Sequence, residues 1–370
     1  MGNPNPNFKI DNVISPEKLV EIQRATNADA DGKEERDRNL RANKLKPASD
    51  TLESIVDLRD PVEPVQTGIA GLDAILHGGL RAGVTVIGAV SNIGKTTMAV
   101  QVADHVAAHG KPVLFVTMEQ SDAELTARSL NRFMRAAGTA DVPQHMDLLS
   151  RTARAAWTDQ QRAAFGAAAD EYARTVAPRC LFMEAGTDPT AEAVCAAAER
   201  IKRAYGEAPV VFIDYIQLLS AEDSRTTDKQ RTDNTMRTLQ RYAKDAGVAV
   251  FAISSLNRTA YYDVIKLDSY KESGMIEYGA DVLLGLQPRG MRDAIGGGTL
   301  KEQDRKAAAA RMYDRVGAET VKELELTVVK VRNGAKPDKA VPVTFDANAG
   351  AFLEPTGTRA ALSVEFNGGY

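Results

Sequence analysis

The chain has 370 residues, of which 44% are hydrophobic and 26% are charged. That length allows about two domains, or one large α/β domain with extensions, and the composition is ordinary for a soluble globular protein. The net charge of −4 excludes a surface that is basic all over, so any nucleic acid must bind in a local groove or a ring lining.

The cysteines and the apolar runs indicate the compartment. Cys180 and Cys195 lack the spacing of a metal site and lie in apolar surroundings, so we interpret both as reduced core residues. No apolar run approaches membrane-spanning length, and the first residues do not form a signal peptide. These features predict a cytoplasmic protein.

Three regions are expected along the chain. Residues 1–65 are polar and rich in charge, with a short helix at 49–58 and a proline-marked linker after it. Residues 66–355 carry the patterned segments and form the expected globular domain. Residues 356–370 are a C-terminal tail.

Apolar strands alternate with helices through the globular region. Strands are expected at 84–87, 112–118, 181–183, 210–214, 248–253, 282–286 and 324–331. Capping boxes, Ser121 with Glu124 and Thr158 with Gln161, predict helices that end near residues 137 and 176. Further helices are expected after residue 97, at 191–205 and at 235–246, and a glycine-rich charged insertion spans 296–315.

The apolar runs are continuous and do not alternate with polar residues. Such strands are typical of a parallel sheet that is covered by helices on both faces, which predicts an α/β fold. In these sheets the ligand lies at the carboxyl ends of the strands. Glu119, Asp214 and Ser254 each follow a strand end, so one crevice can gather them.

A phosphate-binding loop joins the first strand to the first helix. Residues 89–96 match the pattern G-x-x-x-x-G-K-[ST], except that Ala89 stands at the first glycine. Backbone N–H groups at the start of a helix cradle a polyphosphate. Lys95 is expected to reach the β- and γ-phosphates and Thr96 to hold Mg²⁺. The expected nucleotide-binding residues here are Ala89, Ser91, Asn92, Ile93, Gly94, Lys95, Thr96 and Thr97.

Two carboxylates are candidates for the chemistry. Asp214 ends a fully apolar strand, where a carboxylate is costly to bury unless it is paired or near a metal, so we expect it to orient Mg²⁺ opposite Thr96. Glu119 has the position of a general base for the attacking water. The alternative for both residues is a cap of the helix that follows.

Two cations follow the last long strand. Period-two alternation places Lys330 and Arg332 on one face, where they are candidates to neutralise a neighbouring subunit's γ-phosphate. The alternative is a solvated strand end before a turn.

A loop between two strands is a candidate for contact with single-stranded DNA. Lys271, Glu272 and Gly274 lie in it, with Arg258 and two tyrosines upstream. On spacing alone, an ordinary surface loop is the better explanation of the segment.

Taken together, these motifs resemble the C-terminal motor domain of DnaB-type replicative helicases, a branch of the RecA-like ATPases with a P-loop NTPase core. The resemblance covers about residues 67–352, with the motifs in the family order. It implies that Glu119 is catalytic, that Arg128 helps to bind nucleotide, and that Lys330 and Arg332 act on the next subunit's site. It also implies that Arg258, Lys271, Glu272 and Gly274 contact DNA.

The sequence departs from the family pattern in two places. Ser255 stands where the family usually has glutamine, at the end of the sensor strand. Residues 1–60 take the place of the family's N-terminal helical domain, as in the short forms of phages and mobile elements.

The resemblance implies an ATP- and Mg²⁺-dependent, ring-forming DNA helicase or single-strand translocase in DNA replication, expected as a homohexamer that works with a loader or primase. Two other functions are compatible with the same motifs. One is a RecA-like DNA-binding ATPase that acts in recombination or loading without unwinding. The other is a signalling or scaffold ATPase without nucleic acid, which the acidic sequence pI of about 5.8 favours.

Overall fold

A computed structural model describes residues 48, 52, 63–139, 141–184, 189–219, 227–270, 274–295, 300–332 and 340–353. The residues Glu63–Tyr370 group as one compact unit, separate from Met1–Val62. The helix expected at 49–58, the charged N-terminal stretch and the C-terminal tail fall almost wholly outside the described residues. Among the described residues, no helix has both the length and the apolar character needed to cross a bilayer.

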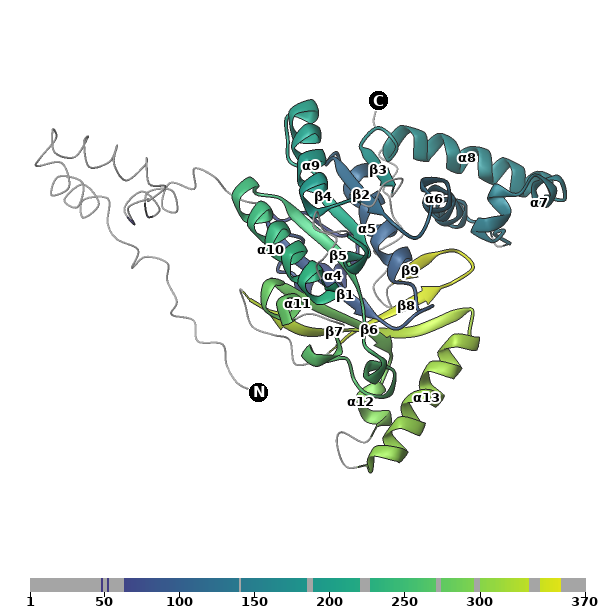
Figure 1. Ribbon diagram of the computed structural model, residues 1–370. Coiled ribbons are helices and arrows are strands. Elements are labelled where there is room, and N and C mark those ends of the chain that lie inside the picture. Colours follow the sequence, from purple (N-terminus) through teal and green to yellow (C-terminus); the bar gives the residue numbers. More distant parts are fainter. Residues whose placement is uncertain are drawn as a thin grey trace, which may run out of the picture. The chain divides into compact units, whose positions relative to one another are not determined.

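One sheet contains the nine strands of the described residues, in the order β3-β2-β4-β5-β1-β6-β7-β8-β9. The strands are β1 (Gly83–Ala89), β2 (Val113–Thr117), β3 (Cys180–Glu184), β4 (Val210–Asp214), β5 (Ala249–Ser255), β6 (Val282–Pro288), β7 (Val321–Val331), β8 (Val341–Asp346) and β9 (Ala351–Leu353). The pairs from β3 through β6 are parallel, and β7, β8 and β9 extend the sheet with antiparallel pairs (Figure 1).

Helices cover both faces of the sheet (Figure 1). The α-helices are α4 (Ala70–Ile75), α5 (Lys95–Ala108), α6 (Asp122–Ala136), α7 (Arg151–Ala155), α8 (Asp159–Thr175), α9 (Ala191–Tyr205), α10 (Asp228–Ala246), α11 (Gly274–Gly279), α12 (Met291–Ala294) and α13 (Glu302–Ala318). Four 3₁₀ helices join them in the described residues: η2 (His145–Leu149), η3 (Ile216–Leu218), η4 (Arg258–Tyr262) and η5 (Leu267–Ser269).

The buried strands supply two apolar layers, one on each face. Within β1, Val84 and Val86 join the layer that is covered by α9, α10 and α11. Ile87 and Ala89 join the other layer, which is covered by α4 and α5. Every residue of β1, β2 and β4 is buried, which explains why these strands read as continuous apolar runs.

The strands and capped helices expected from the sequence are confirmed. Both capping boxes are present, at the starts of α6 and α8, and the mainly parallel sheet with helices on both faces is the expected fold. Strands β8 and β9 were not expected from the sequence. Pro342 interrupts the apolar pattern of β8, and proline within a run argues against a strand that is paired on both sides.

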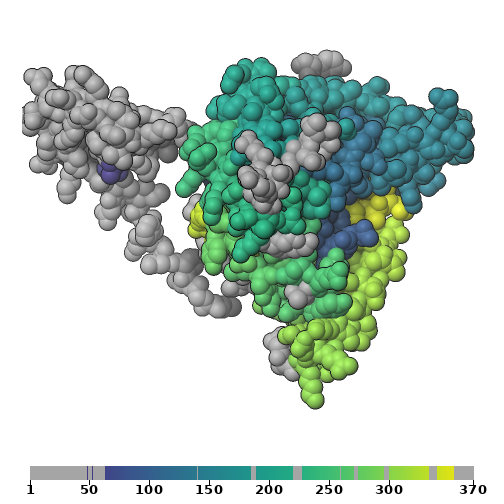
Figure 2. Space-filling model, in the orientation of Figure 1, coloured from purple at the N-terminus to yellow at the C-terminus, as the bar shows by residue number. Residues whose placement is uncertain are grey.

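The insertion between β6 and β7 contains α12 and α13. In the space-filling view its light green surface forms the lower tip of the domain (Figure 2). Met291, Ile295 and Ala309 form a small apolar cluster that joins the two helices. The insertion therefore has a packed core of its own.

Candidate active site

The loop after β1 has the backbone conformation that its glycine permits. Gly94 caps the start of α5 with a φ of 100°, in the left-handed region. A Cβ atom at Gly94 would lie 2.9 Å from Phe352 Cζ and 3.0 Å from Phe345 Cε1. Ala89 is instead the last residue of β1 and is not among the described residues with positive φ. An alanine therefore fits at the first position of this loop, whereas only glycine fits at Gly94.

Lys95 is folded back against its own loop. Its Nζ donates to the carbonyl oxygens of Ala89 at 2.8 Å and of Val90 at 3.0 Å. Burial lowers the pKa of Lys95, and the nearby carboxylates of Asp214 and Glu119 act in the opposite direction. The ammonium group thus lies at the start of α5, where the exposed N–H groups and the helix dipole also favour an anion.

Asp214 is almost fully buried at the end of β4, at 2% exposure. Its Oδ2 accepts a hydrogen bond of 2.7 Å from the Thr96 hydroxyl. Burial raises the pKa of Asp214 to about 6; the Thr96 bond opposes this, Glu119 adds to it, and Lys95 and Arg128 oppose it. A hydroxyl and a carboxylate held together next to a lysine are the donor set that suits Mg²⁺ bound to a polyphosphate.

Glu119 and Arg128 complete the group of side chains at the carboxyl ends of the parallel strands, beside Lys95 and Asp214. Glu119 is exposed in the turn after β2, and its charge acts on both Lys95 and Asp214. Arg128 on α6 donates from Nε to Gln120 Oε1 at 3.1 Å and from Nη1 to Thr97 Oγ1 at 3.4 Å. Burial lowers the pKa of Arg128, while the charges of Asp214 and Glu124 raise it. The expected convergence of strand ends is therefore present in the structure.

The β8–β9 hairpin, which was not expected from the sequence, packs against the phosphate loop. The rings of Phe345 and Phe352 stack with centroids 4.7 Å apart, next to Gly94. The Gln101 side chain of α5 bonds the backbone of Phe352 at both its N–H and its carbonyl, at 2.7 and 3.0 Å. The hairpin thus fixes α5 and the loop relative to the sheet.

Lys330 and Arg332, the two cations expected to act as a finger on a neighbouring subunit's γ-phosphate, do not lie beside the phosphate loop. Lys330 Nζ donates to the carbonyl oxygens of Glu277, Tyr278 and Ala280, at 2.6, 3.1 and 2.9 Å. Arg332 pairs with Asp281 at 2.8 Å. Burial lowers the pKa of Lys330, and the Arg332 charge lowers it further. Arg332 also donates to the Tyr278 carbonyl oxygen at 2.5 Å, so both cations bind the C-terminal end of α11.

Asp281 shows how far these cations are from the loop. Its Oδ2 accepts a hydrogen bond from the backbone N–H of Val84, at the beginning of β1, whereas the phosphate loop follows the end of β1. A strand of seven residues spans about 20 Å, which exceeds the reach of an arginine side chain. Lys330 and Arg332 thus lie at the opposite edge of the sheet from the loop of their own subunit.

The model of the DnaB-like helicase C-terminal domain family matches residues 64–354. The chain belongs to this family. The resemblance and the RecA-like fold expected from the motifs are both confirmed.

Curated relatives of the chain include DnaB proteins. The replicative DNA helicase DnaB of Leifsonia xyli subsp. xyli is 29% identical over 295 residues, which cover 78% of this chain and 56% of the relative. The replicative DNA helicase DnaB of Helicobacter pylori is 25% identical over 291 residues, covering 74% of this chain and 56% of the relative. The chain thus matches little more than half the length of these two relatives.

Two solved structures share the fold. The first, an isolated ATPase domain, superposes with a TM-score of 0.64 at 20% identity, covering 83% of this chain and 97% of that one. The second, a DnaB-like replicative helicase studied with its primase interactions, gives a TM-score of 0.64 at 19% identity, covering 83% of this chain and 66% of that one.

The residues that the sequence suggests for DNA contact are only partly described. Lys271 and Glu272 lie outside the described residues, Arg258 is exposed at the start of η4, and Gly274 begins α11. An unexpected neighbour of the loop is Tyr261 of η4, whose hydroxyl lies 3.5 Å from the Ser91 backbone nitrogen. The segment with Arg258 therefore touches the phosphate loop of this DnaB-like domain.

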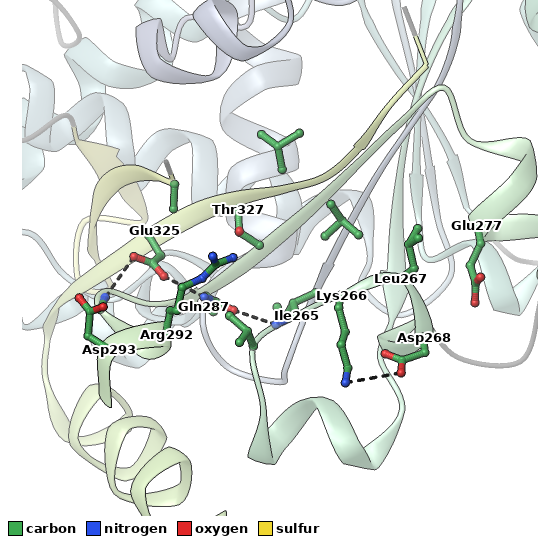
Figure 3. Close-up of a pocket in the computed structure, with 15 residues that line it drawn as sticks. Ile265, Lys266, Leu267, Asp268, Glu277, Gln287, Arg292, Asp293, Glu325 and Thr327 are labelled. Carbon is green, nitrogen blue, oxygen red and sulfur yellow. Dashed lines mark hydrogen bonds and ion pairs between the residues drawn. The ribbon is translucent and has the colours of Figure 1, made fainter. Parts of the chain in front are cut away.

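A pocket of about 890 Å³ lies beside the segment that leads to these contact positions (Figure 3). Gln287 spans it, accepting from the Ile265 N–H at 2.9 Å and donating to Glu325 at 2.8 Å. Its charged lining residues are Lys266, Arg292, Asp268, Glu277, Asp293 and Glu325. Four carboxylates against two cations do not suit a DNA phosphate backbone, and the Gln287 bonds tie Ile265 to β7.

Proposed function

We propose that this protein is an ATP-driven, ring-forming DNA helicase, or single-strand DNA translocase, that acts in DNA replication and hydrolyses ATP at subunit interfaces. The observation that carries the proposal is the split site. Lys95, Thr96, Asp214 and Glu119 gather at one edge of the sheet, whereas Lys330 and Arg332 lie at the other edge. The choice of DNA as the substrate is supported by the family to which the chain belongs, that of the DnaB-like helicase C-terminal domain.

Each residue of the first edge has a role that follows from its chemistry. Gly94 and the N-terminus of α5 offer backbone N–H groups to the phosphates, and Lys95 exchanges its carbonyl partners for phosphate oxygens. Thr96 and Asp214 hold Mg²⁺, which when bound neutralises charge on the β- and γ-phosphate oxygens. Arg128 holds the nucleotide beside Thr97.

Glu119 is the proposed general base. It follows β2 at the same edge and is exposed, so an attacking water can reach it. A carboxylate in that place orients the water and accepts its proton.

The second edge acts on the next subunit. Lys330 and Arg332 cannot reach their own loop, because β1 lies between. A head-to-tail ring places this edge against the first edge of the neighbour, which completes each site with two cations. We therefore propose a closed homo-oligomer, with a hexamer as the expected size.

The DNA contacts are proposed at Arg258, Lys271, Glu272 and Gly274, facing the centre of the ring. The net charge of −4 agrees with a local DNA-binding lining and disagrees with a basic outer surface. A related solved structure concerns interactions with primase, and we propose a primase or a helicase loader as partner in the cytoplasm.

The first experiment is ATP turnover with and without single-stranded DNA, on protein whose mass is measured by light scattering with Mg²⁺ and nucleotide. Strong stimulation with a ring mass is the expected result, and strand displacement on a forked duplex then tests unwinding. Lys95→Ala is the control for contaminating ATPases.

Three other results would contradict the proposal. A ring that is stimulated by DNA but displaces no strand indicates a recombination or loading ATPase. An ATPase without salt-dependent single-strand binding indicates a signalling role. A monomer that is indifferent to DNA leaves only the nucleotide site.

A further inference from the structure

Gln217 joins two neighbouring strands at the point where their backbones separate. The ladder between β4 and β5 runs from Val211 opposite Val250 to Ile213 opposite Ala252 and ends there. Beyond it, β4 turns into η3, which contains Gln217. The side chain of this residue is 7% exposed and points back to the end of β5.

The carboxamide of Gln217 continues the interrupted ladder. Its Nε2 donates to the Ser255 carbonyl at 3.3 Å, and its Oε1 accepts from the Ser255 N–H at 3.2 Å. Nε2 also donates to the Ser254 hydroxyl at 2.9 Å. A primary amide has the donor and acceptor of a peptide group, so Gln217 pairs with Ser255 as another strand would.

On one side, Gln217 is tied to the nucleotide site. It lies three residues after Asp214, and the turn between them is closed by the Leu218 N–H bonded to the Tyr215 carbonyl at 3.1 Å. The Asp214 carboxylate is in turn bonded to Thr96. A shift of Asp214 therefore moves the η3 turn with it.

On the other side, Ser255 leads to the proposed DNA-contact segment. The next residue, Leu256, forms a bridge with Tyr270, and the Asn257 N–H donates to the Ser269 carbonyl at 2.8 Å. Tyr270 directly precedes residues 271–274. The Tyr270 hydroxyl is buried and donates to the Leu284 carbonyl at 2.7 Å, which holds this end of the segment on β6.

We propose that Gln217 is a positioning residue that transmits changes at Asp214 to residues 256–270, and so couples the nucleotide site to the DNA-contact segment. The coupling to DNA rests on the proposed function, whereas the hydrogen bonds between Gln217 and Ser255 are independent of it.

Two variants and a matched control test the proposal. Gln217→Met removes the amide at similar volume, and Gln217→Glu keeps the shape and the acceptor but replaces the Nε2 donor with an oxygen. Gln101→Met is the control, because Gln101 is also a buried glutamine that bonds a strand backbone at both its atoms, but that backbone is Phe352 and not Ser255. Loosening of α5 in this variant should change ATP turnover equally with and without DNA. Thermal melting confirms that each variant is folded.

The first readout is the ratio of ATP turnover with single-stranded DNA to turnover without it. Both Gln217 variants should keep basal turnover within about threefold and lose most of the stimulation, whereas Gln101→Met should keep the wild-type ratio. A wild-type ratio in either folded Gln217 variant would overturn the proposal.

The second readout needs no DNA and separates this proposal from the proposed function. Hydrogen exchange of residues 256–270 is compared with and without a non-hydrolysable ATP analogue and Mg²⁺. The analogue should change the exchange of this segment in wild type and in Gln101→Met, but not in the Gln217 variants. If wild type shows no DNA stimulation but does show this difference, the proposed function fails and the coupling stands. Equal changes in all four proteins would refute the coupling.

Discussion

The hydroxyl of Thr96 and the carboxylate of Asp214 are bonded at 2.7 Å, although 118 residues separate them in the chain. The first residue belongs to the helix after the phosphate loop and the second to the end of β4. Their contact holds the loop at the carboxyl edge of the sheet, where the charges of Lys95 and Glu119 also act.

The Thr96 hydroxyl should be required for metal-dependent turnover. Replacing Thr96 with valine removes the hydroxyl at similar volume, and we expect ATP turnover at saturating Mg²⁺ to fall by about a hundredfold. Thr96→Ser keeps the hydroxyl and should stay close to wild type. Equal turnover in the serine and valine variants would rule out a role for the hydroxyl.

Removing the Glu119 carboxylate should stop hydrolysis without stopping binding. For Glu119→Gln we expect turnover lower by about a hundred- to ten-thousandfold, because a general base contributes that much. Fluorescent-nucleotide titration should show unchanged affinity, since Glu119 is exposed and does not hold the loop. Glu124→Gln, which changes a carboxylate of the α6 capping box, is the control.

Lys330 and Arg332 should act on the neighbouring subunit. We expect Lys330→Ala and Arg332→Ala to lower turnover by about a thousandfold or more while nucleotide binding remains. Mixing equal amounts of Arg332→Ala and Lys95→Ala protein should restore part of the activity. In a random head-to-tail ring, about a quarter of the interfaces then join an intact phosphate loop to an intact pair of Lys330 and Arg332. Mass measurement should show that the mixed rings have exchanged subunits. If such rings recover no activity, Lys330 and Arg332 act on their own subunit's site or have no role in hydrolysis.

Gly94→Ala should destabilise the protein more than Gly110→Ala does. Both glycines have a positive φ, of 100° and 89°, so alanine at either site costs about 1–2 kcal/mol of strain. At Gly94 the new methyl also meets Phe352 and Phe345, whereas at Gly110 it meets nothing within 4 Å. We expect a free energy of unfolding lower by at least about 1 kcal/mol for Gly94→Ala than for Gly110→Ala, since overpacking costs about 1–3 kcal/mol. Urea unfolding measures both, and equal losses would show that the aromatic pair yields at no cost.

Asp214 should make the nucleotide-free protein less stable as the pH rises. Its pKa is raised to about 6 in the fold, against about 3.9 in an unfolded chain, so the folded state binds the proton more tightly. The stabilising contribution is complete below pH 4 and is lost as the pH rises through 6. Asp214→Asn does not titrate and should gain stability over wild type across that interval, by at most about 3 kcal/mol.

The measurement is chemical unfolding of both proteins in EDTA at pH 4, 5, 6 and 7. Comparing them at each pH cancels the titration of the other groups. A constant difference between the two proteins at all four values would mean that the pKa of Asp214 is not raised.

The sequence by itself determined the strands, the helix starts and the phosphate loop, which depend on residues that are neighbours along the chain. Continuous apolar runs indicated buried parallel strands, capping boxes placed the starts of α6 and α8, and the loop from Ala89 to Thr96 indicated a phosphate site. Each of these signals is complete within a few residues, because an apolar run, a capping box and a loop motif all involve residues that are close in the sequence.

The tertiary structure decided what depends on distant partners. Phe352 pairs with Gln101 across 251 positions, Lys330 caps α11 across about fifty, and Gln217 meets Ser255 across 38. A glutamine or a lysine has no local pattern that names such a partner, since the partner is set by which strands become neighbours in the sheet. The position of the two cations, at the end of β7 that lies beside the start of β1, follows from the antiparallel pairing of β7 with β6 and from the contacts of Asp281.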